Sequence, residues 1–268
     1  MPAVEQPQYG IFTRHTSTTR YSADWLLIYD PRMQTPRRPI LAVLGALAIA
    51  VTLVSGCSSS SKKSSAPLPE AATLLKQSSQ ITKNVKSVHL MVSVSGKIKG
   101  LAVKTLTGDL TTSPATAAKG DAKITVSGSD VDAPFVVDNG TLFAALTAGK
   151  WDDFGPAANI YDPSLILNPD TGLANLLANI ANPKSDSRET INGQDTIKIT
   201  GMAPVDAVNG LVPQLKATQP LPATVWIEEN GDHQLVQAQL VQSAGNSIQM
   251  TVWNWNAPVQ VTVPPVSG

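Results

Sequence analysis

Strict alternation of apolar and polar side chains is the feature that most limits what this chain can fold into. Residues 88–94 place Val or Leu at every second position, and residues 121–127 repeat the pattern with Ala, Ile and Val. A period of two puts these side chains on one face of a β-strand and the intervening ones on the other. The pattern therefore predicts an antiparallel sheet with one apolar and one wet face.

Turn signals divide the other alternating segments into hairpins. Asn139-Gly140 joins residues 135–137 to 142–147, and Asn192-Gly193 precedes a strand at 196–200. Asn-Gly supplies the two left-handed residues that a two-residue hairpin turn needs. Further strands are expected at 103–112, 223–229, 234–242, 247–255 and 259–263, whereas 114–119 and 151–161 are expected to be loops.

Helical periodicity marks the segments that can cover the apolar face. Residues 69–86 carry an apolar stripe, with Pro69 and Glu70 suited to a first helical turn. Two short helices are expected after Asp162, interrupted at Pro169, and another in residues 204–215. The fold class is thus α+β, a long antiparallel sheet covered by helices.

The predicted inner face of the sheet is lined mostly by small and medium side chains, and only 5% of the chain is aromatic. Two interpretations stay open at this point: an ordinary packed core, or a cavity between sheet and helices. We assign residues to the inner face by taking every second position of each strand. A shift of one residue would therefore move all assigned side chains of that strand to the other face. The assigned residues are Leu90, Val92, Val94, Ala122, Ile124, Val126, Ile197, Ile199, Val225, Ile227, Val236, Ala238, Leu240, Ile248, Met250 and Val252.

The only cysteine, Cys57, follows an apolar run at residues 40–54 and precedes a serine-rich tract. Val54-Ser55-Gly56-Cys57 matches a lipobox, in which cleavage before the cysteine leaves its thiol as the attachment point for acyl chains. The apolar run is shorter than the roughly 20 residues that span a bilayer, and it matches the core of a signal peptide. The alternative is an N-terminal membrane anchor with a chance cysteine.

These signals divide the chain into four parts. Residues 1–32 are interpreted as an extension from a mis-assigned start codon, because Met33 opens a compact signal sequence with Arg37 and Arg38. Residues 33–56 are the signal peptide, 57–69 the lipidated cysteine with its Ser/Pro linker, and 70–268 the remaining domain. The mature protein is expected to be lipid-anchored at the extracytoplasmic face of the cell membrane.

Charge and motifs argue against several classes of function. The 15 basic and 17 acidic residues after position 56 leave little net charge, and no basic patch indicates a nucleic-acid binder. His89 and His233 have no nucleophile or carboxylate at motif spacing. No spacing of Cys, His or acidic residues indicates a metal site or a cofactor. We therefore expect a protein that is not an enzyme and uses no metal or cofactor.

Trp253 and Trp255 are expected on one outer face of a late strand, opposite to Met250 and Val252. Exposed tryptophans at this spacing could touch a membrane, sugar rings or a protein partner. Packing under a loop or helix is the alternative, and both interpretations stay open.

Several longer runs resemble a known family. They are Val103-Lys104-Thr105-Leu106, Trp151-Asp152-Asp153-Phe154-Gly155-Pro156, Asn168-Pro169-Asp170-Thr171-Gly172-Leu173, Thr190-Ile191-Asn192-Gly193-Gln194 and Ala223-Thr224-Val225-Trp226-Ile227. Together with the lipobox, these runs resemble the LppX/LprA/LprF/LprG family of mycobacterial cell-envelope lipoproteins. The resemblance extends from Met33 to the C-terminus.

The resemblance implies a fold similar to periplasmic lipoprotein carriers, in which a curved antiparallel sheet, a half-barrel, covers helices around a hydrophobic cavity. It implies binding of multiply acylated lipids such as lipoarabinomannan, phosphatidylinositol mannosides or triacylglycerol, and their transfer toward the outer envelope or cell wall. It also implies cooperation with a major-facilitator efflux transporter. The alternative function is an envelope scaffold or assembly lipoprotein that works through protein contacts.

Overall fold

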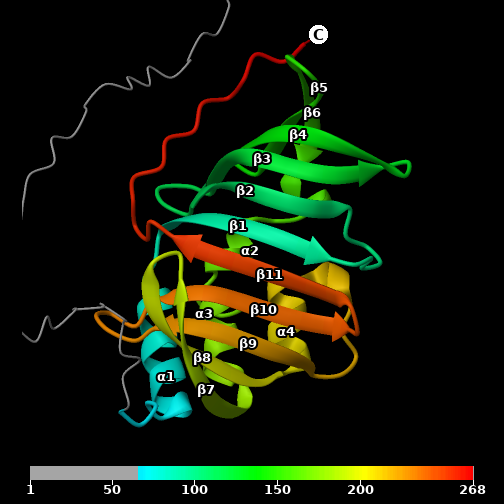
Figure 1. The fold of residues 1–268 in the computed structure, drawn as a ribbon. Helices are drawn as coiled ribbons and strands as arrows, with labels where there is room; N and C mark the ends of the chain where they lie inside the picture. Colours follow the sequence, from blue (N-terminus) through cyan, green and yellow to red (C-terminus); the bar gives the residue numbers. More distant parts are fainter. Residues whose placement is uncertain (1–65, 268) are drawn as a thin grey trace, which may run out of the picture. The chain divides into compact units, whose positions relative to one another are not determined.

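Eleven strands form one curved sheet in which every pair of neighbours is antiparallel (Figure 1). The computed structural model describes residues 66–267, which belong to one unit, Ser59–Gly268. The spatial order is β6-β5-β4-β3-β2-β1-β11-β10-β9-β8-β7. The strands are β1 (Ser87–Ser95), β2 (Val103–Thr111), β3 (Ala117–Val126), β4 (Ser129–Asp138), β5 (Thr141–Thr147), β6 (Lys150–Pro156), β7 (Ala181–Ile191), β8 (Gln194–Ala203), β9 (Leu221–Glu228), β10 (Leu235–Ser243) and β11 (Asn246–Trp253).

The two edge strands, β6 and β7, follow one another in the chain. Strands β1 to β6 add in turn on one side, and β7 to β11 return from the far edge until β11 pairs with β1, with Leu90 opposite Val252. The chain must therefore cross from one edge of the sheet to the other between β6 and β7. This crossing holds η1 (Ala157–Asn159), α2 (Ser164–Leu167) and α3 (Leu173–Asn179).

Helix α1 (Ala71–Thr82) lies within the expected 69–86, but it begins two residues later and ends four residues earlier. The Glu70 carboxylate caps the helix by accepting hydrogen bonds from the N–H groups of Ala72 at 3.0 Å and Thr73 at 2.6 Å. The buried face of α1 packs against α3 and β7, while α3 also contacts α4 (Val205–Leu211). Figure 1 shows α1, α3 and α4 behind the half of the sheet that contains β8 to β10.

Both Asn-Gly hairpin predictions are confirmed. Asn139 and Gly140 have φ values of 47° and 80° between β4 and β5, and Asn192 and Gly193 have 50° and 82° between β7 and β8. Two consecutive left-handed residues define the type I′ turn, whose twist matches that of the flanking strands.

Three other expectations are wrong. Strand β6 occupies most of the expected loop 151–161, as an edge strand with irregular register against β5. Strand β3 begins at Ala117, inside the expected loop 114–119. Residues 259–263 form no strand, because β11 already pairs with β1 and β10 on its two sides and prolines at 258 and 264 lack N–H donors. Between residues 66 and 267, no helix has the length and hydrophobicity needed to span a bilayer.

Candidate functional site

Sheet register gathers most of the predicted inner-face residues into continuous rows. In one row Val92 lies opposite Met250, and Met250 lies opposite Ala238. The row continues from Ala238 through Val225 to Ile199. Neighbouring positions on the same face hold Leu90 and Val252; Val94, Ile248 and Leu240; Ile227 and Ile197; and, on β3, Ala122 and Ile124.

Two predicted residues stand apart from these rows. Val126 is the last residue of β3 and is 41% exposed. Val236 lies where the register of β10 shifts, so that Leu235 lies opposite Ile227 and Gln237 opposite Trp226. Counting every second residue is valid only where the strand pairing is regular. A β-bulge adds one residue to one strand, so the count fails beyond it.

Helices fill one end of the inner face. Ile197, Ile199, Val225 and Ile227 are fully buried, in one cluster with residues of α1, α3 and α4. The packed-core interpretation therefore holds for this half of the sheet.

The other end of the inner face is only partly covered. We call the residues Val92, Val94, Leu106, Ala122, Ile248 and Met250 the open band. Strand register makes them neighbours, because Val92 pairs with both Met250 and Leu106, and Leu106 pairs with Ala122. All but Ala122 keep intermediate exposure although they are apolar and contact the main core. A second apolar surface laid on the open band would remove this area from water.

Tyr161, which the sequence analysis did not single out, ties the crossing segment to α4. Its hydroxyl donates a hydrogen bond to the carbonyl oxygen of Leu211 at 3.0 Å, and the Gln214 side-chain amide donates to the carbonyl of Ile160 at 2.7 Å. Tyr161 packs against the same core as the open band, and burial raises the pKa of its phenol well above the ordinary value. The position of this aromatic residue directly before Asp162, after which a helix is expected, was the sequence signal that could have singled it out.

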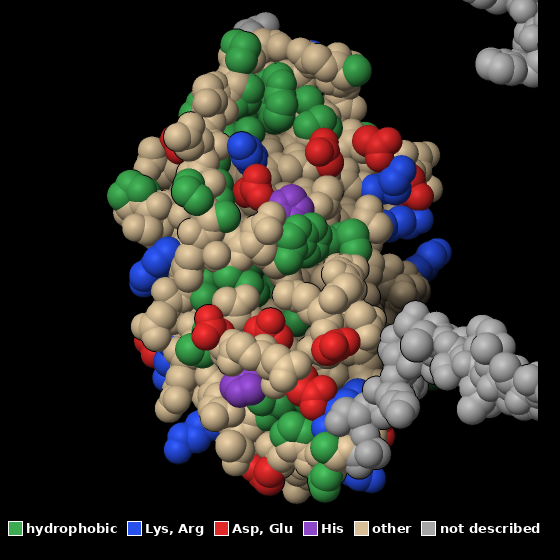
Figure 2. Space-filling model, turned by 60° about the vertical axis from the view of Figure 1, so that its left-hand side comes forward, with side chains coloured by type: hydrophobic (Ala, Val, Ile, Leu, Met, Phe, Trp, Pro, Cys, Tyr) green, Lys and Arg blue, Asp and Glu red, His purple; other side chains and the backbone are tan. Residues whose placement is uncertain are grey.

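The outer face carries a shallow hollow of about 390 Å³ over β1 to β4, lined in part by His89, Asp109 and Trp151. His89 Nδ1 lies 2.6 Å from Asp109 Oδ1, and His89 Nε2 lies 3.3 Å from Thr107 Oγ1. Sequence spacing did not show this carboxylate beside His89, because β1–β2 pairing creates the contact. Figure 2 shows histidine, hydrophobic and acidic side chains together on the face that it draws.

Asp109, His89 and Thr107 contact one another in the order of a catalytic triad. A triad also needs hydrogen-bond donors that stabilise an oxyanion, and this site does not provide them. Thr107 lies in β2, which is paired on both sides with β1 and β3. The backbone N–H groups of β2 therefore form hydrogen bonds within the sheet, and they offer no pair of free donors to an oxyanion. Within residues 66–267, no cluster of three His, Cys, Asp or Glu side chains could hold a metal ion.

The expectation that Trp253 and Trp255 share an outer face is wrong. Strand β11 ends at Trp253, and Asn254 and Asn256 beyond it have φ values of 54° and 57°. The left-handed residues break the alternation of a strand. Trp253 lies on the outer face with its ring tilted by 48° to that of His89 and the two centroids 4.4 Å apart, whereas Trp255 packs against the main core.

Comparison of sequences shows close relatives with a described role. A family described as the LppX_LprAFG lipoprotein matches residues 70–261. A protein of Mycobacterium tuberculosis named lipoarabinomannan carrier protein LprG is 58% identical over 237 residues, which cover 88% of this chain and 100% of that protein. The protein of the same name from Mycobacterium leprae is 56% identical over 238 residues, with coverage of 88% and 100%.

Solved structures agree with the fold. LprF from Mycobacterium bovis superposes with a TM-score of 0.66 at 32% identity, covering 75% of this chain and 99% of that one. The lipoprotein LppX of Mycobacterium tuberculosis gives a TM-score of 0.57 at 30% identity, with coverage of 72% and 98%. The open antiparallel sheet with helices on one face is therefore common to these lipoproteins.

Proposed function

Because the chain belongs to the LppX_LprAFG lipoprotein family, we propose that it is an extracytoplasmic carrier that binds acyl chains of lipids against the open band. The observation that supports this is the open band itself, an apolar surface that continues from a packed core yet stays partly exposed. An ordinary core would bury such residues fully, as the other half of this sheet does.

The energetics favour acyl chains as ligands. Burial of apolar area contributes roughly 25 cal/mol for each Å² removed from water. This force has no direction, so the open band selects for an acyl chain and tolerates changes in chain number or length. Small residues such as Ala122 leave room for a ligand methylene in the space that a larger side chain would fill.

The ligand class follows from the relatives. The proteins named lipoarabinomannan carrier protein LprG from Mycobacterium tuberculosis and Mycobacterium leprae are 58% and 56% identical to this chain over 88% of its length. We take multiply acylated lipids as the cargo, with lipoarabinomannan, phosphatidylinositol mannosides and triacylglycerol as candidates, and movement toward the outer envelope as the purpose. The proposed pump partner is a major-facilitator transporter.

Anchoring is a separate part of the proposal. Cys57 and the signal peptide lie outside the described residues, and acylation of Cys57 is inferred from the lipobox. A single acyl chain holds a protein to a membrane only marginally, whereas two or more give a lasting anchor. In this proposal acyl chains thus serve twice, as an anchor on Cys57 and as cargo on the open band.

Mass spectrometry of lipid extracted from purified protein tests the carrier function. The mature chain is produced with Cys57→Ser, so that any lipid recovered is bound and not attached. We expect multiply acylated lipid in near-stoichiometric amount. Recovery of no amphiphile from folded protein would contradict the carrier and favour the scaffold alternative.

A further inference from the structure

A groove of about 410 Å³ lies between α1 and α3, apart from both the open band and the outer-face hollow. Its floor contains the buried apolar residues Leu75, Leu177 and Ile180. Lys76 on α1 and Lys83, which caps the C-terminus of this helix, contribute to its lining and are exposed. None of the residues that line it is acidic.

The surrounding chain strengthens this basic character. Residues 71–88, which run from the start of α1 into β1, contain Lys76, Lys83 and Lys86 and no Asp or Glu. The nearest preceding acid in the chain, Glu70, is engaged with the N–H groups at the start of α1. On β7, Asp186 lies 3.9 Å from Lys198, and Glu189 also contacts Lys198. These two carboxylates are therefore paired with Lys198.

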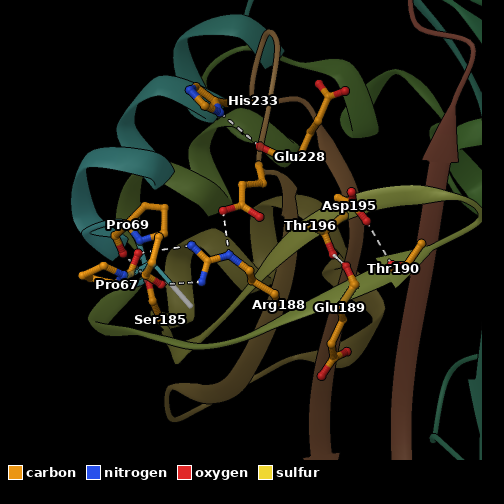
Figure 3. Close-up of polar contacts among 12 residues, drawn as sticks. Pro67, Pro69, Ser185, Arg188, Glu189, Thr190, Asp195, Thr196, Glu228 and His233 are labelled. Carbon is orange, nitrogen blue, oxygen red and sulfur yellow. Dashed lines mark hydrogen bonds and ion pairs between the residues drawn. The ribbon is translucent and has the colours of Figure 1, made fainter. Parts of the chain in front are cut away.

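Polar contacts fix the point where the N-terminal linker meets the domain (Figure 3). The Arg188 guanidinium donates to the carbonyl oxygens of Ala66 at 2.8 Å and Pro67 at 3.1 Å, while its Nε donates to Glu229 at 2.7 Å. The Ser185 hydroxyl donates to the carbonyl of Pro69 at 2.7 Å. Residues 66–69 are therefore held against the edge strand β7, immediately before α1 begins.

Chain length then limits where the anchored cysteine can be. The nine steps from Cys57 to Ala66 span at most roughly 30 Å when fully extended. The six steps from Ala66 to Ala72, which lines the groove, span at most roughly 20 Å. A membrane that holds Cys57 is thus within reach of the face that carries the groove.

We propose that the α1–α3 groove is a docking site for the anionic phospholipid surface of the membrane that holds Cys57. Lys76 and Lys83 meet the headgroup phosphates, and the groove floor admits the apolar part just below them. The inference rests on acylation of Cys57, which belongs to the proposed function. Docking on this face sets the orientation of the carrier on its membrane and leaves the opposite edge, β6, directed away.

Lysine reactivity in the tethered protein tests the proposal. Cys57 is the only cysteine, so the unacylated mature chain can be coupled through its thiol to a maleimide phospholipid in vesicles. Amine-reactive labelling is then followed lysine by lysine by mass spectrometry. Lys97 and Lys99, exposed on the loop between β1 and β2, serve as the internal control.

With phosphatidylglycerol in the vesicles, we expect labelling of Lys76 and Lys83 to slow several-fold relative to Lys97 and Lys99. With phosphatidylcholine alone, the four rates should change together. High salt should reverse the protection, because screening weakens the attraction between exposed charges. Equal rates at all four lysines on anionic vesicles would overturn the proposal.

Charge-removal variants give a second measurement without any tether. Lys76→Gln with Lys83→Gln should weaken binding of the untethered chain to phosphatidylglycerol vesicles about 25-fold, about fivefold for each lysine near the surface. The matched control, Lys97→Gln with Lys99→Gln, removes the same charge and should change binding little. If both double variants lost vesicle binding equally, net charge alone would explain the effect, and the proposed docking site would be wrong.

These outcomes are distinct from failure of the proposed function. Thiol coupling does not depend on acylation in the cell, so it reports docking even if Cys57 proves unmodified. Lipid extraction reports cargo without any vesicle. Docking with no cargo would contradict only the carrier, and cargo without docking would contradict only this inference.

Discussion

Two adjacent serines on α1 show how much one hydrogen bond decides at the residue scale. Ser78 and Ser79 are both buried, at 0% and 4% exposure. The Ser79 hydroxyl donates to the carbonyl of Ala174 on α3 at 2.8 Å. The Ser78 hydroxyl has no hydrogen-bond partner among the described residues. A buried polar group without a partner costs free energy, whereas a satisfied one contributes modestly.

We therefore predict opposite responses to the same substitution. Ser79→Ala should lower the free energy of unfolding by about 1 kcal/mol or somewhat more, because the Ala174 carbonyl loses its donor. Ser78→Ala should leave the free energy of unfolding unchanged or raise it. Urea denaturation of both variants measures the difference, and equal losses would contradict the assigned bonding.

Glu189 on β7 makes the stability depend on acid pH. The pKa of Glu189 is lowered chiefly by the Trp226 indole N–H, which donates to its carboxylate at 2.7 Å. Burial opposes this as the next largest effect, and Lys198 and Ser187 lower the pKa further. A pKa that is lower in the folded state stabilises the protein above the unfolded-state value. That stabilisation is lost as the pH falls through about 4.3 and below.

The expected result of Glu189→Gln is a flatter decline of the free energy of unfolding below about pH 4.3. Trp226→Phe keeps the apolar packing but removes the N–H donor, so it should flatten the same part of the curve. Denaturation curves are measured from about pH 3 to 7, because this range includes the pH at which Glu side chains titrate. If the free energy of unfolding declines at acid pH in both variants as it does in the unmodified protein, Glu189 does not contribute to the pH dependence.

At the element scale, one glycine allows the crossing segment to meet the sheet. A Cβ atom built on Gly201 of β8 would lie 2.4 Å from Ile180 Cγ2 and 2.9 Å from the carbonyl oxygen of Ala181. Ile180 caps the C-terminus of α3 and Ala181 begins β7, so this contact sets the path of the chain as it leaves the helix.

Gly201→Ala should accordingly destabilise the protein by about 1–3 kcal/mol, the usual cost of overpacking a tight contact. Thr200→Ala on the same strand is the control and should cost less, because Thr200 is only half-buried and has no such approach. Guanidinium denaturation compares them, and a smaller loss for Gly201→Ala than for Thr200→Ala would contradict the contact.

Helix and strand patterns were most predictable where the element is regular. The first helix, strands β1, β2 and β5 and both Asn-Gly hairpins follow from local periodicity and turn chemistry, whereas β3 and β4 begin earlier than the expected 121–127 and 135–137. Edge strands were less predictable, because β6 and β7 pair on one side only and carry register shifts. The bulge near Val236 shows the same limit within a central strand.

At the scale of the whole molecule, the sheet has two functionally different halves. Helices close the inner face over β8 and β9, while the open band stays partly exposed on β1, β2 and β11. The proposed cargo therefore lies beside the packed core, and Ala122 lies at the edge of the open band with 9% exposure.

Ala122→Trp should reduce bound lipid strongly, since the large ring would occupy space on the open band next to Leu106. Asp121→Trp is the matched control, because Asp121 is exposed on the opposite face of the same strand. Lipid content per protein, measured by mass spectrometry alongside circular dichroism of the fold, gives the result. Unchanged loading in a folded Ala122→Trp variant would show that the cargo lies elsewhere.

The sequence by itself determined the approximate positions of β1, β2, β5 and β8 to β11 and both Asn-Gly hairpins, because each depends on residues close together in the chain. Tertiary structure decided which strands are neighbours, so it alone placed Asp109 beside His89, turned Trp255 away from Trp253 and held the linker with Arg188. It also decided which part of the apolar face is filled by helices and which part remains open. The physical reason is that burial depends on what covers a face, and the covering segments come from distant parts of the chain.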